Sequence, residues 1–212
     1  MPRAAATEPK SPYGVSPAVA MLQKWEAELK DRTGRTLREW VALVKEEAPG
    51  DAKSRVEWLK SKFKLGTNGA KEIVQRASGK RDEFSDPDEY LKAAVQYVEN
   101  QYAGAKKKLH PIYEKLLEKG KSLGGDVEAC PCKTIVPLYR QHVFAQIKPA
   151  TNSRVDLGLA LAHYKGKLPK RLVDTGGLAK KDRITHRIEL KSLSDIDSDV
   201  DKWLKIAYDL DA

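Results

Sequence analysis

Residues 133–161 read KTIVPLYRQHVFAQIKPATNSRVDLGLAL and decide the fold of the second half of the chain, because their apolar residues recur with a period of two. The stretch divides into three strand candidates at 133–140, 143–148 and 154–161, and ITHRIELK at 184–191 supplies a fourth. Gln141 and His142 are too few residues for a crossover, so we expect the first two strands to pair antiparallel. The pattern predicts an antiparallel sheet.

Helical signals flank the predicted sheet on both sides. Asp86, Pro87 and Glu89 are typical of a helix start, and Pro111 begins a second helix. A closing amphipathic helix follows the last strand, because apolar residues recur there at helical spacing. Those residues are Val200, Trp203, Leu204, Ala207 and Tyr208. We therefore predict an antiparallel sheet packed by helices over residues 86–212.

Residues 17–80 show helical signals alone. Ser16 before Pro17, and Thr36 three positions before Glu39, are N-terminal capping patterns. Two further helices, from about 52 to 63 and over a short stretch carrying apolar residues at 70–77, flank a turn at 65–68. These signals predict an all-α bundle that ends in a helix-turn-helix-like pair. The fold class predicted for the whole chain is α+β.

An acidic stretch containing Gly and Pro, at residues 79–87, separates the two halves. We expect a helical domain at 17–80, an α+β domain at 86–212 and a flexible tail at 1–16, which is rich in Ala, Pro and Ser. No apolar run reaches the roughly 20 residues that a membrane span needs. No signal-peptide pattern opens the chain, and the two cysteines are too close for a disulfide framework. A cytoplasmic protein without membrane contact is expected.

The formal net charge of +9 and the sequence pI of about 9.4 favour an anionic partner. Residues 106–191 carry 19 Lys and Arg against 8 Asp and Glu, and residues 1–80 carry 16 against 10. DNA or RNA, a small anion and an acidic protein are all partners that this charge fits. The sequence does not distinguish between them.

The helix-turn-helix-like pair is the first candidate site. A DNA-binding pair of this kind presents basic and amide side chains from its second helix to a major groove. Helical hairpins are common, however, and lysine suits any solvated helix, so a solvated surface is the alternative interpretation. The predicted nucleic-acid-binding residues are Lys60, Lys62, Lys64, Asn68, Lys71, Gln75 and Arg76.

Polar residues within the predicted sheet form the second candidate. Arg154 and Asp156 share one strand face, whereas His186 lies on the apolar face of its own strand. Since an unpaired buried polar group costs ~1–3 kcal/mol, His186 needs a partner, either a ligand or a neighbouring side chain. The alternatives are a site for a small anion and a histidine with a structural role. The predicted ligand-binding residues are Tyr139, Lys148, Arg154, Asp156 and His186.

The sequence lacks the motifs of nucleophile elbows, phosphate-binding loops and dinucleotide sites, so a binding protein is favoured and enzymatic activity is uncertain. Cys130 and Cys132 have the wrong spacing for zinc and the four histidines are scattered, so we expect no metal and no cofactor. Asp156 and the triplet Glu189-Leu190-Lys191 match the acidic and E-x-K elements of metal-dependent nucleases. That pattern is short enough to recur by chance.

The strand-rich region, with ITHRIEL at 184–190 and DVDKWLKIAYD at 199–209, resembles an uncharacterised bacterial domain often labelled "predicted transport protein". TGRTLREWVALVKE at 33–46 and EWLKSKFKLGTNGAKEIV at 57–74 resemble a second, helical domain commonly fused ahead of it. The resemblance covers roughly Ala18 to Tyr208 and implies a two-domain bacterial protein. It implies no catalytic residues, and the transport label conflicts with the lack of an apolar span.

Overall fold

A computed structural model describes residues 11–80 and 83–212, which divide into two compact units. The helical unit is Ser16–Tyr90, and the sheet unit is Leu91–Ala212 together with residues 11–15. The division falls within α5 (Pro87–Gln101), which begins where the sequence places a helix start. Residues 1–10 of the predicted tail, and residues 81 and 82 of the predicted junction, lie outside the described residues.

The helical unit contains α1 (Pro17–Thr33), α2 (Leu37–Glu47), α3 (Ala52–Phe63), α4 (Thr67–Ala77) and the short 3-10 helix η1 (Glu83–Ser85). Local capping sets the starts of these helices. The Ser16 side chain accepts a hydrogen bond from the amide of Ala18, and Thr36 and Glu39 form the predicted capping box. None of the helices in the described ranges is long and apolar enough to cross a bilayer.

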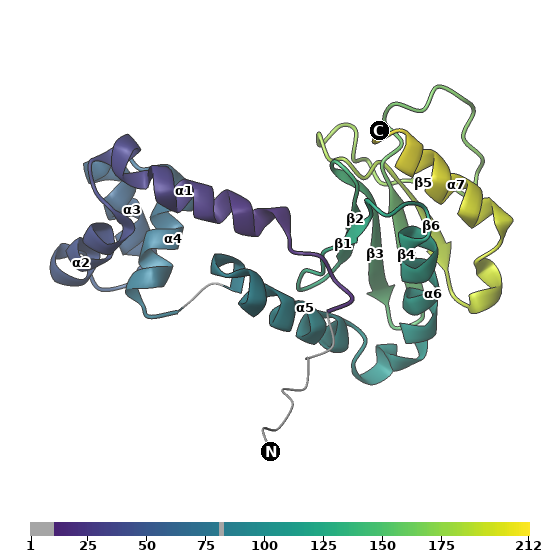
Figure 1. The fold of residues 1–212 in the computed structure, drawn as a ribbon, viewed down its shortest axis with the longest axis horizontal. Helices are drawn as coiled ribbons and strands as arrows, with labels where there is room; N and C mark the ends of the chain where they lie inside the picture. Colours follow the sequence, from purple (N-terminus) through teal and green to yellow (C-terminus); the bar gives the residue numbers. More distant parts are fainter. Residues whose placement is uncertain (1–10, 81–82) are drawn as a thin grey trace, which may run out of the picture. The chain divides into compact units, whose positions relative to one another are not determined.

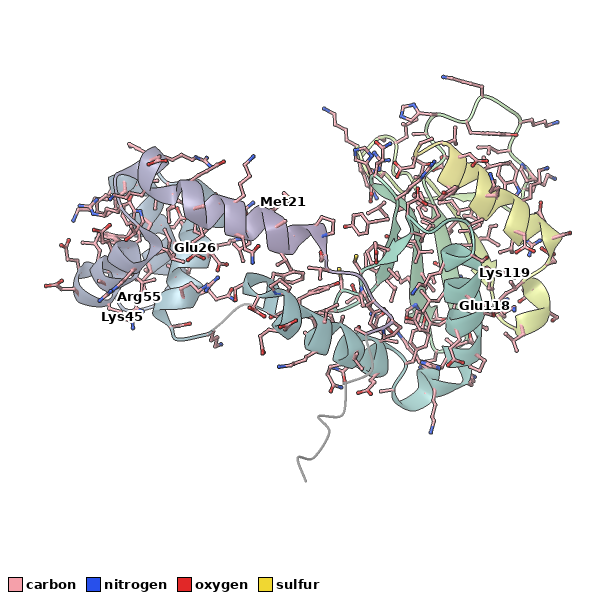
Figure 2. The ribbon with its side chains drawn as sticks, in the orientation of Figure 1. Met21, Glu26, Lys45, Arg55, Glu118 and Lys119 are labelled. Carbon is pink, nitrogen blue, oxygen red and sulfur yellow. The ribbon has the colours of Figure 1, made fainter. Side chains whose placement is uncertain are left out.

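The core of the helical unit is built around Trp40, which is buried against Leu59 and Ile73. Its indole Nε1 donates a hydrogen bond to Thr33 Oγ1 at 2.8 Å, so the polar atom of the ring is satisfied. The apolar stripe of α1 is only partly covered. Trp25 is half-buried, and Met21 is 71% exposed on the same helix (Figure 2).

The described residues of the sheet unit form a six-stranded antiparallel sheet in the order β1-β2-β3-β4-β6-β5. The strands are β1 (Glu128–Ala129), β2 (Val136–Tyr139), β3 (Val143–Thr151), β4 (Arg154–Leu159), β5 (Val173–Asp174) and β6 (His186–Leu190). The four long strands lie where the period of two predicts them, and β2 pairs antiparallel with β3 as expected. The two-residue strands β1 and β5 are too short to show a periodicity.

The helices α6 (His110–Lys121) and α7 (Ser198–Asp209) cover one face of this sheet (Figure 1). Leu157 of β4 and Ile188 of β6 are register partners that are fully buried in the shared core. Lys119 of α6, labelled in Figure 2, lies 2.6 Å from Asp201 of α7 and links the two helices. The α+β fold class is therefore confirmed.

Alternation along β4 and β6 separates two kinds of surface. Residues that alternate with the core positions, such as Asp156 and Gly158 on β4, lie on the face opposite α6 and α7.

Residues 11–15 belong to the same unit. The amide of Gly14 donates to the Ala129 carbonyl at 3.0 Å, and the hydroxyls of Tyr13 and Tyr113 are 3.0 Å apart.

Candidate functional site

The N-terminus of α4 lies at a basic pocket in the helical unit. Lys64 ends α3 in the left-handed conformation with φ 58°, and Gly66 is the N-cap residue of α4 without a side-chain capping bond. The amides of Thr67 and Asn68 have no hydrogen-bond acceptor among the residues that the structure describes. The partial positive charge at this helix end therefore remains available to an anion.

The pocket in front of that helix end has a volume of about 460 Å³. Arg32 and Lys64 line it together with Trp25, and the described residues that line it include no aspartate or glutamate. Arg32 comes from α1 and was not predicted as a site residue, because nothing in its local sequence links it to a turn more than thirty positions away. Arg32 Nη1 lies 3.9 Å from Glu28 Oε2, so the pocket combines Lys64 and a partly neutralised Arg32 with free backbone donors.

The seven residues predicted to contact nucleic acid divide into two groups in the structure. Lys64, Asn68 and Lys71 are exposed around the start of α4. Lys60 pairs with Glu57 at 2.9 Å and Lys62 with Glu47 at 3.2 Å, so part of their charge is already neutralised.

The other two predicted residues lie further along α4. Arg76 donates to Glu72 at 2.7 Å and approaches Glu26, and Gln75 is half-buried. The structure thus places Lys64 and Asn68 in the lining of the pocket, whereas Lys71 is exposed on α4 and is not among the lining residues. It leaves Lys60, Lys62 and Arg76 in ion pairs.

The predicted polar cluster of the sheet is a closed ion-pair network on the face opposite α6 and α7. Arg154 Nε lies 2.8 Å from Asp156 Oδ1, and Arg154 Nη1 lies 3.1 Å from Glu189 Oε2. Arg187 joins the network, with its Nη2 2.9 Å from Glu189 Oε1 and its Nε 3.4 Å from Asp156 Oδ2. The Arg187 hydrogen bond holds the pKa of Glu189 below its usual value. Two guanidinium groups therefore neutralise two carboxylates.

This neutralisation weighs against the nuclease-like interpretation of Asp156 and Glu189. The two residues are register partners on neighbouring strands, as such a site requires. Their oxygens, however, are held by arginines, which compete with a metal ion for the same lone pairs. No group of three or more potential metal ligands occurs in the described parts of the chain.

Of the remaining predicted ligand-binding residues, Lys148 is the register partner of Asp156, whereas His186 and Tyr139 lie elsewhere in the sheet. His186 pairs in register with Leu159, on the core side of the sheet, and its Nδ1 lies 3.0 Å from Thr185 Oγ1. Tyr139 is half-buried at the end of β2, and burial raises the pKa of its hydroxyl. Lys148 is exposed and lines a pocket that includes neither Arg154 nor Asp156. The structure therefore brings Lys148, Arg154 and Asp156 onto neighbouring strands but leaves His186 and Tyr139 apart from them.

Comparison with known proteins gives two matches. Residues 98–211 match the family described as Domain of unknown function (DUF5655), and residues 22–79 match the one described as Domain of unknown function (DUF4287). No curated protein and no solved structure matches the chain. The second match falls inside the helical unit and the first inside the sheet unit. The pairing of two domains of unknown function agrees with the two-domain family that the sequence resembles.

Proposed function

The chain belongs to the family Domain of unknown function (DUF5655), and from its geometry we propose that the protein binds the phosphate backbone of a nucleic acid through its helical unit. The observation that carries this proposal is the basic pocket at the start of α4, which Lys64 lines, and Lys71 is exposed on the same helix. Backbone amides at a helix N-terminus suit one phosphate group. Lys64 and Lys71 suit the neighbouring phosphates of the same strand.

The arrangement favours backbone contact over base reading. Phosphate contacts position a protein on a duplex, whereas sequence is read by side chains that reach base edges. Asn68 is the exposed amide side chain near the start of α4, and Gln75 further along is half-buried. We therefore propose binding with little sequence preference and a strong dependence on salt.

The location and origin of the protein form the remaining part of this proposal. The resemblance described above supports a bacterial source. The two cysteines, Cys130 and Cys132, are both free, which suits a reducing cytoplasm. A transport role is not part of the proposal.

The test compares two double variants with the same loss of charge. Lys64→Ala with Lys71→Ala removes the lysine that lines the pocket and the exposed lysine of α4. Lys45→Ala with Lys53→Ala removes exposed cations elsewhere in the helical unit (Lys45 is labelled in Figure 2). Binding to a mixed-sequence DNA duplex is measured by fluorescence anisotropy across a salt series. We expect the first variant to lower the salt slope by about two, one for each lost phosphate contact. The control should keep the slope of the unmodified protein.

Two results would contradict the proposal. One is no detectable binding by the unmodified protein at about 50 mM salt, where even non-specific contacts are strong. The other is an equal loss in both variants, because equal losses indicate general attraction rather than a site. Either result would leave an acidic protein as the partner that the charge of the helical unit fits.

A further inference from the structure

An apolar groove lies between α1 and the start of α4 in the helical unit. Its volume of about 310 Å³ lies at the lower end of the range of roughly 300–1,000 Å³ that is typical of small-molecule sites. One wall is a stripe of α1 side chains at helical spacing, made of Ala18, Met21, Leu22 and Trp25. The other wall belongs to α4 and consists of Asn68, Gly69 and Glu72.

This groove leaves apolar surface open to solvent. Met21 is 71% exposed, more than any other large apolar side chain that the structure describes. Glu72 is the acidic residue of the lining, but its carboxylate accepts from Arg76 Nε at 2.7 Å and is therefore already paired. Thioether and indole groups both pack well on aromatic rings. The lining therefore suits a flat, unsaturated ring.

The groove meets the basic pocket at Trp25. Trp25, Asn68 and Gly69 line both. Gly69 is helical without a left-handed backbone, so its conformation does not require glycine, and glycine is a poor helix former. A Cβ at this position would lie 3.3 Å from Trp25 Cζ2, so the missing side chain lets the indole lie against the start of α4. An apolar surface and a basic pocket are thereby joined.

We propose that the groove takes an unpaired base of a single-stranded nucleic acid while a phosphate of the same strand occupies the basic pocket. This inference rests on the proposed function and adds the contact with a base. The base packs on Trp25 and Met21, and the phosphate faces Lys64. In a duplex the bases are paired and stacked on one another, so only the phosphate contacts remain. Stacking on aromatic side chains tolerates every base, in agreement with binding of little sequence preference.

The test uses the full chain and three DNA probes of equal length. They are one strand of the duplex used above, the duplex itself, and an abasic strand that keeps the phosphates and lacks the bases. We expect the complete strand to bind at least about fivefold more tightly than the abasic strand, because a stacked base contributes that much or more. The same comparison with RNA strands shows whether DNA, RNA or both supply the base.

Matched variants test the groove. Trp25→Ala should weaken binding of the single strand at least about fivefold and leave binding of the duplex unchanged. Trp58→Ala removes a half-buried tryptophan of the same unit outside both pockets, and it should change neither. Met21→Ala should weaken single-strand binding by a smaller factor without affecting the fold. Its control is Leu178→Ala, which removes a 69% exposed side chain from the sheet unit. Circular dichroism checks that each variant is folded.

Two results would overturn this inference and leave the proposed function standing. One is equal binding of the complete and abasic strands, which would leave an apolar side chain of a partner protein as the occupant of the groove. The other is equal weakening of single-strand and duplex binding by folded Trp25→Ala. The proposed function depends instead on the salt slope of the Lys64→Ala, Lys71→Ala variant. Absence of binding to strand and duplex alike would remove both.

Discussion

Replacing Asp156 by Asn tests whether the ion-pair network of the sheet stabilises the fold or is kept for a ligand. Asp156 is 9% exposed and contacts Arg154 Nε at 2.8 Å and Arg187 Nε at 3.4 Å. Asparagine keeps the volume but removes the charge, so two guanidinium groups would face one remaining carboxylate, that of Glu189. The fold should lose stability.

The size of the loss follows from the exposure of the partners. Exposed ion pairs contribute ~0–1 kcal/mol, whereas breaking a fully buried pair costs ~3–5 kcal/mol. The side chains of Arg154 and Arg187 are 25% and 28% exposed, so the network lies between these limits. We expect Asp156→Asn to lower the free energy of unfolding by about 2 kcal/mol. For a unit of this size, that corresponds to a fall in Tm of about 6–10 °C.

Glu189→Gln is the matched control, because it removes the other carboxylate of the same network. Its side chain is 31% exposed, so its loss should cost about 0.5–1 kcal/mol. Thermal unfolding by circular dichroism at pH 7 measures both variants. In about 1 M NaCl, where screening is strong, the effect of Glu189→Gln should largely disappear and that of Asp156→Asn should persist. A neutral or stabilising Asp156→Asn variant would refute this reasoning and would point to a ligand that uses the network.

Two further predictions concern pH and thiol reactivity. Backbone amides of Thr36 and Ser54 donate to Glu39 and Asp51 and lower the pKa of each carboxyl below its ordinary value of 4.5 or 3.8. Stability from a lowered pKa is complete above the ordinary value and is lost as pH falls through the folded-state value. The urea midpoint of the helical unit should therefore fall as pH drops below about 4.5. A constant midpoint down to pH 3 would show that these two carboxylates do not stabilise the helical unit. Burial raises the pKa of the Cys130 thiol to about 12. In the folded chain at pH 8 this thiol should therefore react far more slowly with Ellman's reagent than in denaturant. Rapid reaction of both thiols in the folded chain would contradict this prediction.

Helix starts and long strands could be predicted because their signals are local. Thr36 and Glu39 are three positions apart and meet in any helix that begins between them, so the capping box needs no tertiary contact. Strand β3 continues to Thr151, past the predicted end at Lys148, because Thr151 pairs with Arg154 of β4. The strands β1 and β5 exist through their pairing partners β2 and β6.

The sequence predicted which types of residue the candidate sites contain, but not which of those residues lie together or are already paired. Lys60 and Glu57 are three positions apart on one helix, so their ion pair can be predicted from the sequence. Lys62 pairs with Glu47 of another helix, and that pair cannot be predicted from the sequence. Lys148 was predicted in one site with Asp156 and is its register partner, and the structure also places it in the lining of a pocket with Lys106 and Lys133. Whether a charged side chain is free depends on neighbours that are distant in the chain.

The sequence by itself determined the α+β class, the helix starts, the four long strands and the two faces of β4. These features follow from spacing along the chain, since a strand alternates its side chains and a helix is capped within its first turn. Only the tertiary structure decided which charges are neutralised and which line a pocket. It placed Arg32 and Lys64 in one pocket and closed Arg154 and Arg187 around Asp156. It also left Gln101 Oε1 without a donor among the described residues. The physical reason is that Coulomb interactions and hydrogen bonds depend on distance in space, which packing sets and sequence separation does not.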